Sequence, residues 1–152
     1  MKRKILMVAG GLCLAGTLSF DAAAQAKPDV LVKQRQAAMT LQAKYLGPMG
    51  AMAQGKIPYD AKLVQRNAAF LEALSKMAWD GFEPSTKGEK SAALPAVWDN
   101  PGEFKQAAEH FEGEAAKLAQ LSKSGDEAAV KAQIAATGKS CGACHEKFRE
   151  KR

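Results

Sequence analysis

The chain has 152 residues, a formal net charge of +6 and 25% charged residues. This length corresponds to one domain of ordinary size. The excess positive charge is small and spread along the chain, and no basic stripe or set of base-stacking aromatic residues accompanies it. These properties argue against a partner nucleic acid and favour a single globular domain.

The N-terminus has the parts of a secretory signal peptide in their usual order. Positive charges at the start are followed by a largely apolar stretch to Phe20 and by small residues around Ala24. The stretch is shorter than the ~20 apolar residues of a membrane span, which disfavours the alternative of an N-terminal anchor. We predict cleavage after Ala24, with Ala26 as the second choice. Residues 1–24 are then a signal peptide, and residues 25–152 form a periplasmic domain with no membrane association.

The composition of the exported domain, rich in Ala, Lys, Glu, Gln and Leu, favours helix. A first helix is predicted over residues 28–46, where Gly47-Pro48 ends it. A second is predicted over residues 60–79, with Asp60 as its N-cap. In both segments apolar residues recur at steps of three and four, so each helix has one apolar face.

A loop over residues 80–99 follows, and its length indicates that it covers part of the domain. A third helix is predicted from Asn100, where Glu103 is placed to complete a capping box. A fourth is predicted from about Asp126 to about Arg149. Four amphipathic helices with mostly short links predict an all-α fold, an antiparallel up-down-up-down four-helix bundle.

Near the C-terminus the chain has the motif Cys-Gly-Ala-Cys-His, which is typical of covalent haem attachment. Residues three or four apart lie on the same side of a helix, so Cys141 and Cys144 can both reach one edge of the macrocycle. His145 lies four residues beyond Cys141 and can present a ring nitrogen to the iron. We therefore predict one haem c, attached through Cys141 and Cys144, with His145 as the axial metal ligand.

Two other interpretations of the motif are less favoured. A structural zinc site needs about four protein ligands, and His110 is expected on the polar face of the third helix. A redox dithiol needs an activated thiolate, typically at a helix N-terminus, whereas Cys141 lies late in its predicted helix.

The residue on the other side of the iron decides the function. Arg35, Gln36 and Met39 lie within about one turn of the first predicted helix, where a guanidinium suits a haem propionate and a thioether suits an apolar face. The alternative is a core methionine with two solvated neighbours. If Met39 contacts haem, its sulfur either binds the iron or covers an open face, and spacing leaves both roles open.

Other residues are candidates for contact with the haem. Arg149 lies one turn after His145 and can orient or screen that ligand, or else belongs to a solvated basic tail. The aromatic residues Trp79, Phe82 and Trp98 flank the long loop and are expected either to wall the haem edge or to pack in the core.

The sequence resembles the cytochrome c′ family in residues 35–39, 79–82 and 94–98 and in the haem motif followed by Arg149. A haem motif at the C-terminus, together with Arg-Gln-x-x-apolar in the first helix, is more selective than the motif alone. The resemblance implies a periplasmic, usually homodimeric protein whose iron is typically five-coordinate and high-spin and binds NO and CO. It implies electron transfer with redox partner proteins and handling of NO rather than enzymatic catalysis.

By matching position, the resemblance implies that Arg35 and Gln36 contact the haem or its propionates, that Met39 belongs to the distal pocket, and that Arg149 is the basic residue beside the axial histidine. Ser91 stands where many members have a haem-contacting threonine. The related low-spin cytochromes c-556 use a methionine at about the position of Met39 as a second iron ligand. A six-coordinate electron carrier is therefore the alternative function.

Overall fold

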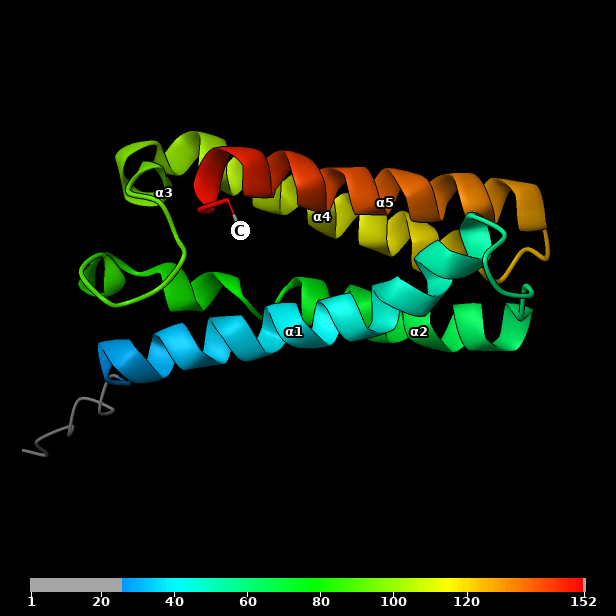
Figure 1. The fold of residues 1–152 in the computed structure, drawn as a ribbon, viewed down its shortest axis with the longest axis horizontal. Coiled ribbons are helices and arrows are strands. Elements are labelled where there is room, and N and C mark those ends of the chain that lie inside the picture. The colour runs from blue at the N-terminus through cyan, green and yellow to red at the C-terminus, as the bar shows by residue number, and fades with distance from the viewer. Residues whose placement is uncertain (1–25, 152) are drawn as a thin grey trace, which may run out of the picture.

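The computed structural model describes residues 26–151, which form an antiparallel four-helix bundle (Figure 1). The all-α up-down-up-down prediction is therefore confirmed. The four long helices are α1 (Pro28–Ala53), α2 (Ala61–Ser75), α4 (Pro101–Leu121) and α5 (Glu127–Phe148). Between α2 and α4 lie the short elements η1 (Trp79–Phe82), η2 (Pro84–Thr86) and α3 (Ala96–Asp99). The predicted signal peptide lies outside the described residues.

The helices pack around the bundle in a ring, with α1 against α2 and α5, and α4 against α2 and α5. A continuous apolar core runs between them and includes Met49, Leu71, Phe111, Leu118 and Ile134. Within residues 26–151 no helix combines the length and the apolar character needed to cross a bilayer.

The prediction that Gly47-Pro48 ends the first helix is wrong, because Pro48 lies inside α1. A proline within a helix costs about 3 kcal/mol. The turn that follows carries Met49 and Met52, whose side chains are only 0% and 4% exposed. Burying each of them stabilises the fold by about 1.5–3 kcal/mol, which offsets the cost of the proline. Core packing therefore extends α1 to Ala53.

The predicted cap at Asp60 forms, and Asp126 caps the fourth helix in the same way. The side chains of Asp60 and Asp126 accept hydrogen bonds from backbone N–H groups three residues on, both at 3.0 Å. The capping box predicted for the third helix does not form, because the Asn100 side chain makes no capping hydrogen bond. Glu103 instead pairs with Lys147 of α5, with Oε2 and Nζ 3.4 Å apart. That ion pair joins α4 to α5 near the end of the bundle that the long loop covers.

The segment between α2 and α4 folds over one end of the bundle (Figure 1). α2 ends at Ser75, earlier than predicted, because Trp79 belongs to η1. Phe82 packs on Phe104 of α4, with ring centroids 4.8 Å apart, and Phe104 packs on Phe148 of α5 at 5.3 Å. The segment thus covers the bundle end, as its length predicts, and it sets one wall of the site described next.

Candidate functional site

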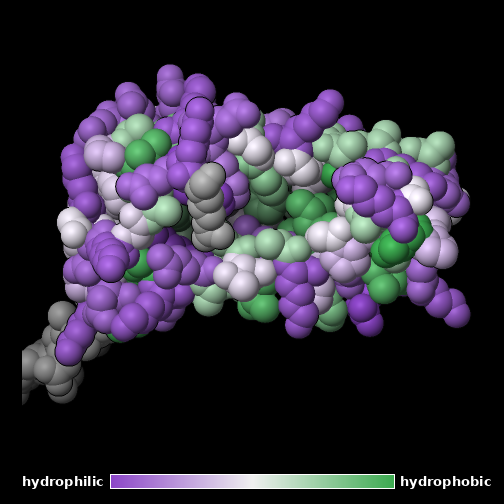
Figure 2. All heavy atoms as spheres, in the orientation of Figure 1, coloured by the Kyte–Doolittle hydropathy of each residue, from purple (hydrophilic) through white to green (hydrophobic). Residues whose placement is uncertain are grey.

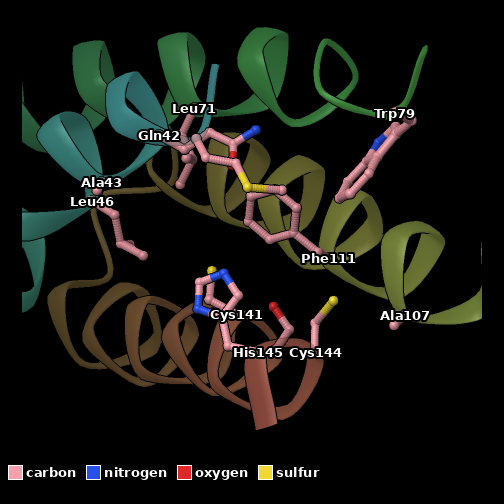
Figure 3. Close-up of a pocket in the computed structure, with 12 residues that line it drawn as sticks. Gln42, Ala43, Leu46, Leu71, Trp79, Ala107, Phe111, Cys141, Cys144 and His145 are labelled. Carbon is pink, nitrogen blue, oxygen red and sulfur yellow. The ribbon is translucent and has the colours of Figure 1, made fainter. Parts of the chain in front are cut away.

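A cavity of about 140 Å³ lies inside the bundle (Figure 3). This volume is roughly ten times what a single water molecule needs. α5 forms one wall, and α1, α2, α4 and η1 form the others. The lining residues are Met39, Gln42, Ala43, Leu46, Leu71, Trp79, Ala107, Phe111, Ser140, Cys141, Cys144 and His145.

The helical spacing of the motif places its three functional side chains on the same wall. Cys141, Cys144 and His145 all line the cavity, and Figure 3 shows them extending from α5 toward its interior. Both cysteines are free and partly buried. The structure therefore brings together the two thiols and the imidazole that the sequence predicts to hold haem.

The ionisation of the thiols argues against a redox dithiol. Burial raises the pKa of Cys141, and the neighbouring Cys144 raises it further. Burial also raises the pKa of Cys144. Redox-active cysteines have lowered pKa values, because the thiolate is the reactive form. The surroundings of Cys141 and Cys144 on α5 raise the pKa values of both thiols, whereas an active redox pair needs a lowered pKa.

The surroundings also argue against a structural metal site. Within residues 26–151 no three His, Cys, Asp or Glu side chains come close enough to hold a metal ion. His110 is exposed on α4, as expected from its polar helix face.

The imidazole of His145 is half-buried in this wall. Burial lowers the pKa of His145, and the positive charge of Arg149 lowers it further. Both effects favour the neutral ring, which is the form that binds a metal ion. The backbone N–H of Arg149 donates to the His145 carbonyl oxygen at 3.1 Å, and Arg149 is paired by an isolated β-bridge with Ala93. Arg149 is thus fixed beside the predicted iron ligand.

The α1 wall carries Met39 but not its predicted companions. Met39 lines the cavity, whereas Gln36 is exposed and outside the lining. Sequence reasoning missed Gln42, which is buried and donates from Nε2 to the Leu74 carbonyl oxygen at 2.8 Å. The sequence places Leu46 on the same helix face as Met39 but does not single it out as a cavity residue. Gln42 and Leu46 follow Met39 at helical spacing, by three and by seven. That spacing is the signal that identifies them.

Arg35 is buried, with 2% of its surface exposed, and it binds the segment that covers the bundle end. Nη1 donates to the Gly81 carbonyl oxygen and to Thr86 Oγ1, the latter at 3.0 Å, and Nη2 donates to Ser91 Oγ at 2.9 Å. The guanidinium also lies 4.3 Å from the centroid of the Phe82 ring. The structure therefore brings Arg35 and Ser91 together, although neither lines the cavity.

Gly81 is required where this segment meets α1. A Cβ atom added at Gly81 would lie 2.6 Å from Arg35 Cβ and 2.8 Å from the Leu31 carbonyl oxygen, closer than side chains approach. Thr86 is fully buried beside it. Sequence reasoning missed the contacts of Gly81 and Thr86, because their partner is about fifty residues away in the chain.

The three aromatic residues that flank the long loop have different positions. Trp79 lines the cavity, whereas Trp98 donates from Nε1 to the Phe82 carbonyl oxygen at 3.0 Å and so holds the loop. The buried Nε1 of Trp79 has no hydrogen-bond partner within residues 26–151. An unpaired buried donor costs about 1–3 kcal/mol. A bound group with acceptor oxygens, such as the propionates of haem, would satisfy this N–H.

The residues present therefore fit haem c: two thiols and an imidazole on one helix, mainly apolar opposing walls, and an unpaired indole N–H. A four-helix bundle that presents a Cys-x-x-Cys-His motif to such a cavity defines the class of bundle-type c cytochromes.

Comparison with known proteins identifies the family. The family model described as cytochrome c′ matches residues 30–149. The cytochrome c′ of Rubrivivax gelatinosus is 44% identical over 126 residues, which are 82% of this chain and 98% of that protein. Its crystal structure has a TM-score of 0.78, with the same coverage of both chains. The chain belongs to the cytochrome c′ family, whose members carry a covalently attached haem c.

Two further relatives bear on what the haem does. The nitric oxide complex of a point mutant of cytochrome c prime from Alcaligenes xylosoxidans is 37% identical and has a TM-score of 0.78, covering 84% of this chain and 99% of that one. Another variant of that protein has carbon monoxide bound. Cytochrome c-556 of Agrobacterium tumefaciens is 34% identical over 122 residues, which are 80% of this chain and 98% of that protein. The family thus contains both a protein whose mutants have been solved with NO or CO bound and a relative named cytochrome c-556.

Proposed function

We propose that the protein is a periplasmic cytochrome c′ that transfers electrons and binds NO and CO at a five-coordinate, high-spin haem iron, and that it is not an enzyme. Cys141 and Cys144 attach the haem through thioether bonds, and His145 is the axial ligand. The observation that supports this most directly is the position of all three side chains on the cavity wall formed by α5.

The bound haem supplies one-electron chemistry and an iron face open to gases. The chain's own residues hold and surround it. Arg149 and the burial of His145 keep the imidazole neutral and ready to bind the iron. Arg35, Gln36 and Ser91 are proposed contacts of the haem edge. The guanidinium of Arg35 has five N–H donors, so it can serve a carboxylate as well as its loop acceptors.

Met39 decides between this function and its alternative, a six-coordinate low-spin electron carrier. Met39 lines the same cavity as His145, from a different helix, which supports a place in the distal pocket. The gas complexes of the Alcaligenes protein favour the open iron. The similarity to a relative named cytochrome c-556 favours an iron that Met39 also ligates.

The optical spectrum of the reduced protein tests the two functions. Broad high-spin bands and rapid CO binding support the five-coordinate iron, and a sharp α-band that CO barely disturbs contradicts it. Met39→Ala leaves the first form nearly unchanged and converts the second to high spin. The intact mass of the exported protein checks the cofactor itself, because a mass equal to the bare chain excludes covalent haem.

Export and assembly complete the proposal. N-terminal sequencing of the periplasmic protein is expected to begin at Gln25, or at Lys27 for the second cleavage site. The partners are then redox proteins, small diatomic gases and a second copy of the chain. Exposed apolar side chains on α1 and α2, including Leu41 and Phe70, support a homodimer formed by these helices.

A further inference from the structure

A second hollow, open to solvent and of about 740 Å³, runs between α1 and α5. Figure 2 shows apolar side chains set back between these two helices. Three lysines, Lys56, Lys131 and Lys139, belong to its walls. The other lining residues are Ala43, Leu46, Gly47, Gly50, Ala51, Ala53, Gln54, Ile134, Ala135 and Gly138. We call this hollow the α1–α5 groove.

The α1–α5 groove and the haem cavity share part of their walls. Ala43 and Leu46 line both of them. Ala43 is exposed and has only a methyl group, whereas Leu46 is half-buried and points into the cavity in Figure 3. Leu46 is therefore the larger of the two side chains that border both hollows.

Three glycines, Gly47, Gly50 and Gly138, line the groove. A Cβ atom added at Gly47 or Gly138 would meet no atom within 4 Å, and one at Gly50 would meet only Gln54 Nε2, at 4.0 Å. The groove therefore has room for a side chain at Gly47 and at Gly138.

We infer that diatomic gases reach the haem cavity through the α1–α5 groove and that Leu46 is the gate between the two. The inference rests on the proposed gas-binding function and adds the route that the gas takes. NO and CO are small and need no polar partner on the way, which matches the apolar walls shared by the groove and the cavity.

Blocking the groove tests the route without touching the cavity. Gly138→Leu places a side chain into the open groove, and Gly138 is not part of the cavity lining. Gly113→Leu is the matched control, because Gly113 is also within a helix, its Cβ would also meet no atom within 4 Å, and it does not line the groove. We expect flash photolysis of the CO-bound holoprotein to show several-fold slower association for Gly138→Leu and an unchanged rate for Gly113→Leu.

Opening the gate is the second test. Leu46→Ala is expected to raise the rate of CO association several-fold, because the shorter side chain leaves the passage between the groove and the cavity open. Leu63→Ala is the control, since Leu63 also packs against the core while partly buried and lines neither hollow.

The outcomes separate the route from the function. If the reduced holoprotein binds CO but Gly138→Leu associates as fast as wild type, the route is wrong and the gas-binding function stands. If Leu46→Ala associates with CO no faster than wild type, Leu46 is not the gate. If the wild-type holoprotein does not bind CO, both the route and the five-coordinate function are wrong.

Discussion

Nη2 of Arg35 donates a hydrogen bond to Oγ of Ser91 at 2.9 Å, which joins the first helix to the segment that covers the bundle end. The same guanidinium also holds Gly81 and Thr86. The buried side chain of Arg35 thus holds in place the segment to which Trp79 belongs, and Trp79 forms part of the cavity wall.

Arg35→Ala is expected to lower the free energy of unfolding by about 1.5–3 kcal/mol, the usual contribution of hydrogen bonds to a charged group. Gln36→Ala, the same truncation at the exposed neighbouring residue, is expected to change it by less than about 0.5 kcal/mol. Urea denaturation of both variants measures the difference. Equal losses would contradict the role of Arg35 as the residue that holds the loop.

Gly81→Ala is expected to destabilise the protein by about 1–3 kcal/mol, the usual effect of overpacking. The added methyl group would lie 2.6 Å from Arg35 Cβ and displace the loop. Gly113→Ala, in open space on α4, is expected to stabilise by about 0.5–1 kcal/mol. Thermal unfolding compares the two variants. A neutral Gly81→Ala would show that the loop can shift away from α1 without cost.

Stability of the haem-free protein is expected to fall in acid because of His145. The pKa of His145 in the folded chain lies below the ordinary value of about 6.5. The unfolded chain therefore binds more protons, and the free energy of unfolding falls as the pH drops below about 6.5 and through the lowered pKa. Urea denaturation of a Cys141→Ala/Cys144→Ala protein across this range measures the effect.

Removing the neighbouring charge is expected to weaken that acid sensitivity. Arg149→Ala raises the pKa of His145 toward its ordinary value, because one of the two causes of the shift is lost. Lys147→Ala removes an equal charge from an exposed position on the same helix and serves as the control. NMR titration of His145 in the haem-free protein follows the pKa directly, and equal shifts in both variants would exclude a specific effect of Arg149.

The proposed homodimer is expected to depend on the exposed apolar face of α1 and α2. Phe70, which is 45% exposed and packs on Tyr45 with ring centroids 4.9 Å apart, belongs to this face. Phe70→Lys is expected to shift the protein toward monomers. Ile57→Lys changes a similarly exposed apolar residue outside both helices and is expected to leave the dimer intact. Sedimentation velocity distinguishes the two variants, and a monomeric wild-type protein would contradict the proposed dimer.

Local patterns predicted the helices and the haem motif because both depend on residues close together in the chain. The three-and-four spacing gives each helix its apolar face, and the motif from Cys141 to His145 fits within two turns. Predictions failed where the structure depends on contacts between residues that are distant in the chain. Pro48 lies within a helix because Met49 and Met52 are buried against other helices.

In the candidate site, too, local spacing predicts some residues, whereas contacts between distant residues could not be predicted. Spacing along the first helix was enough to select Met39, which lines the cavity. It could not reveal that Arg35 is held by Gly81, Thr86 and Ser91, because those acceptors lie 46, 51 and 56 residues away. The unpaired N–H of Trp79 likewise becomes visible only when the neighbouring helices are in place.

The raised pKa values of Cys141 and Cys144 have a consequence for the order of assembly. Thioether formation needs a reactive sulfur, and the thiolate is more reactive than the thiol. Packing of α5 against the bundle suppresses the thiolate at both positions. Both thiols also face a cavity that is walled by the bundle helices. We therefore expect haem attachment to be easier to an open chain than to the closed bundle, so that the cofactor is in place as the bundle forms around it.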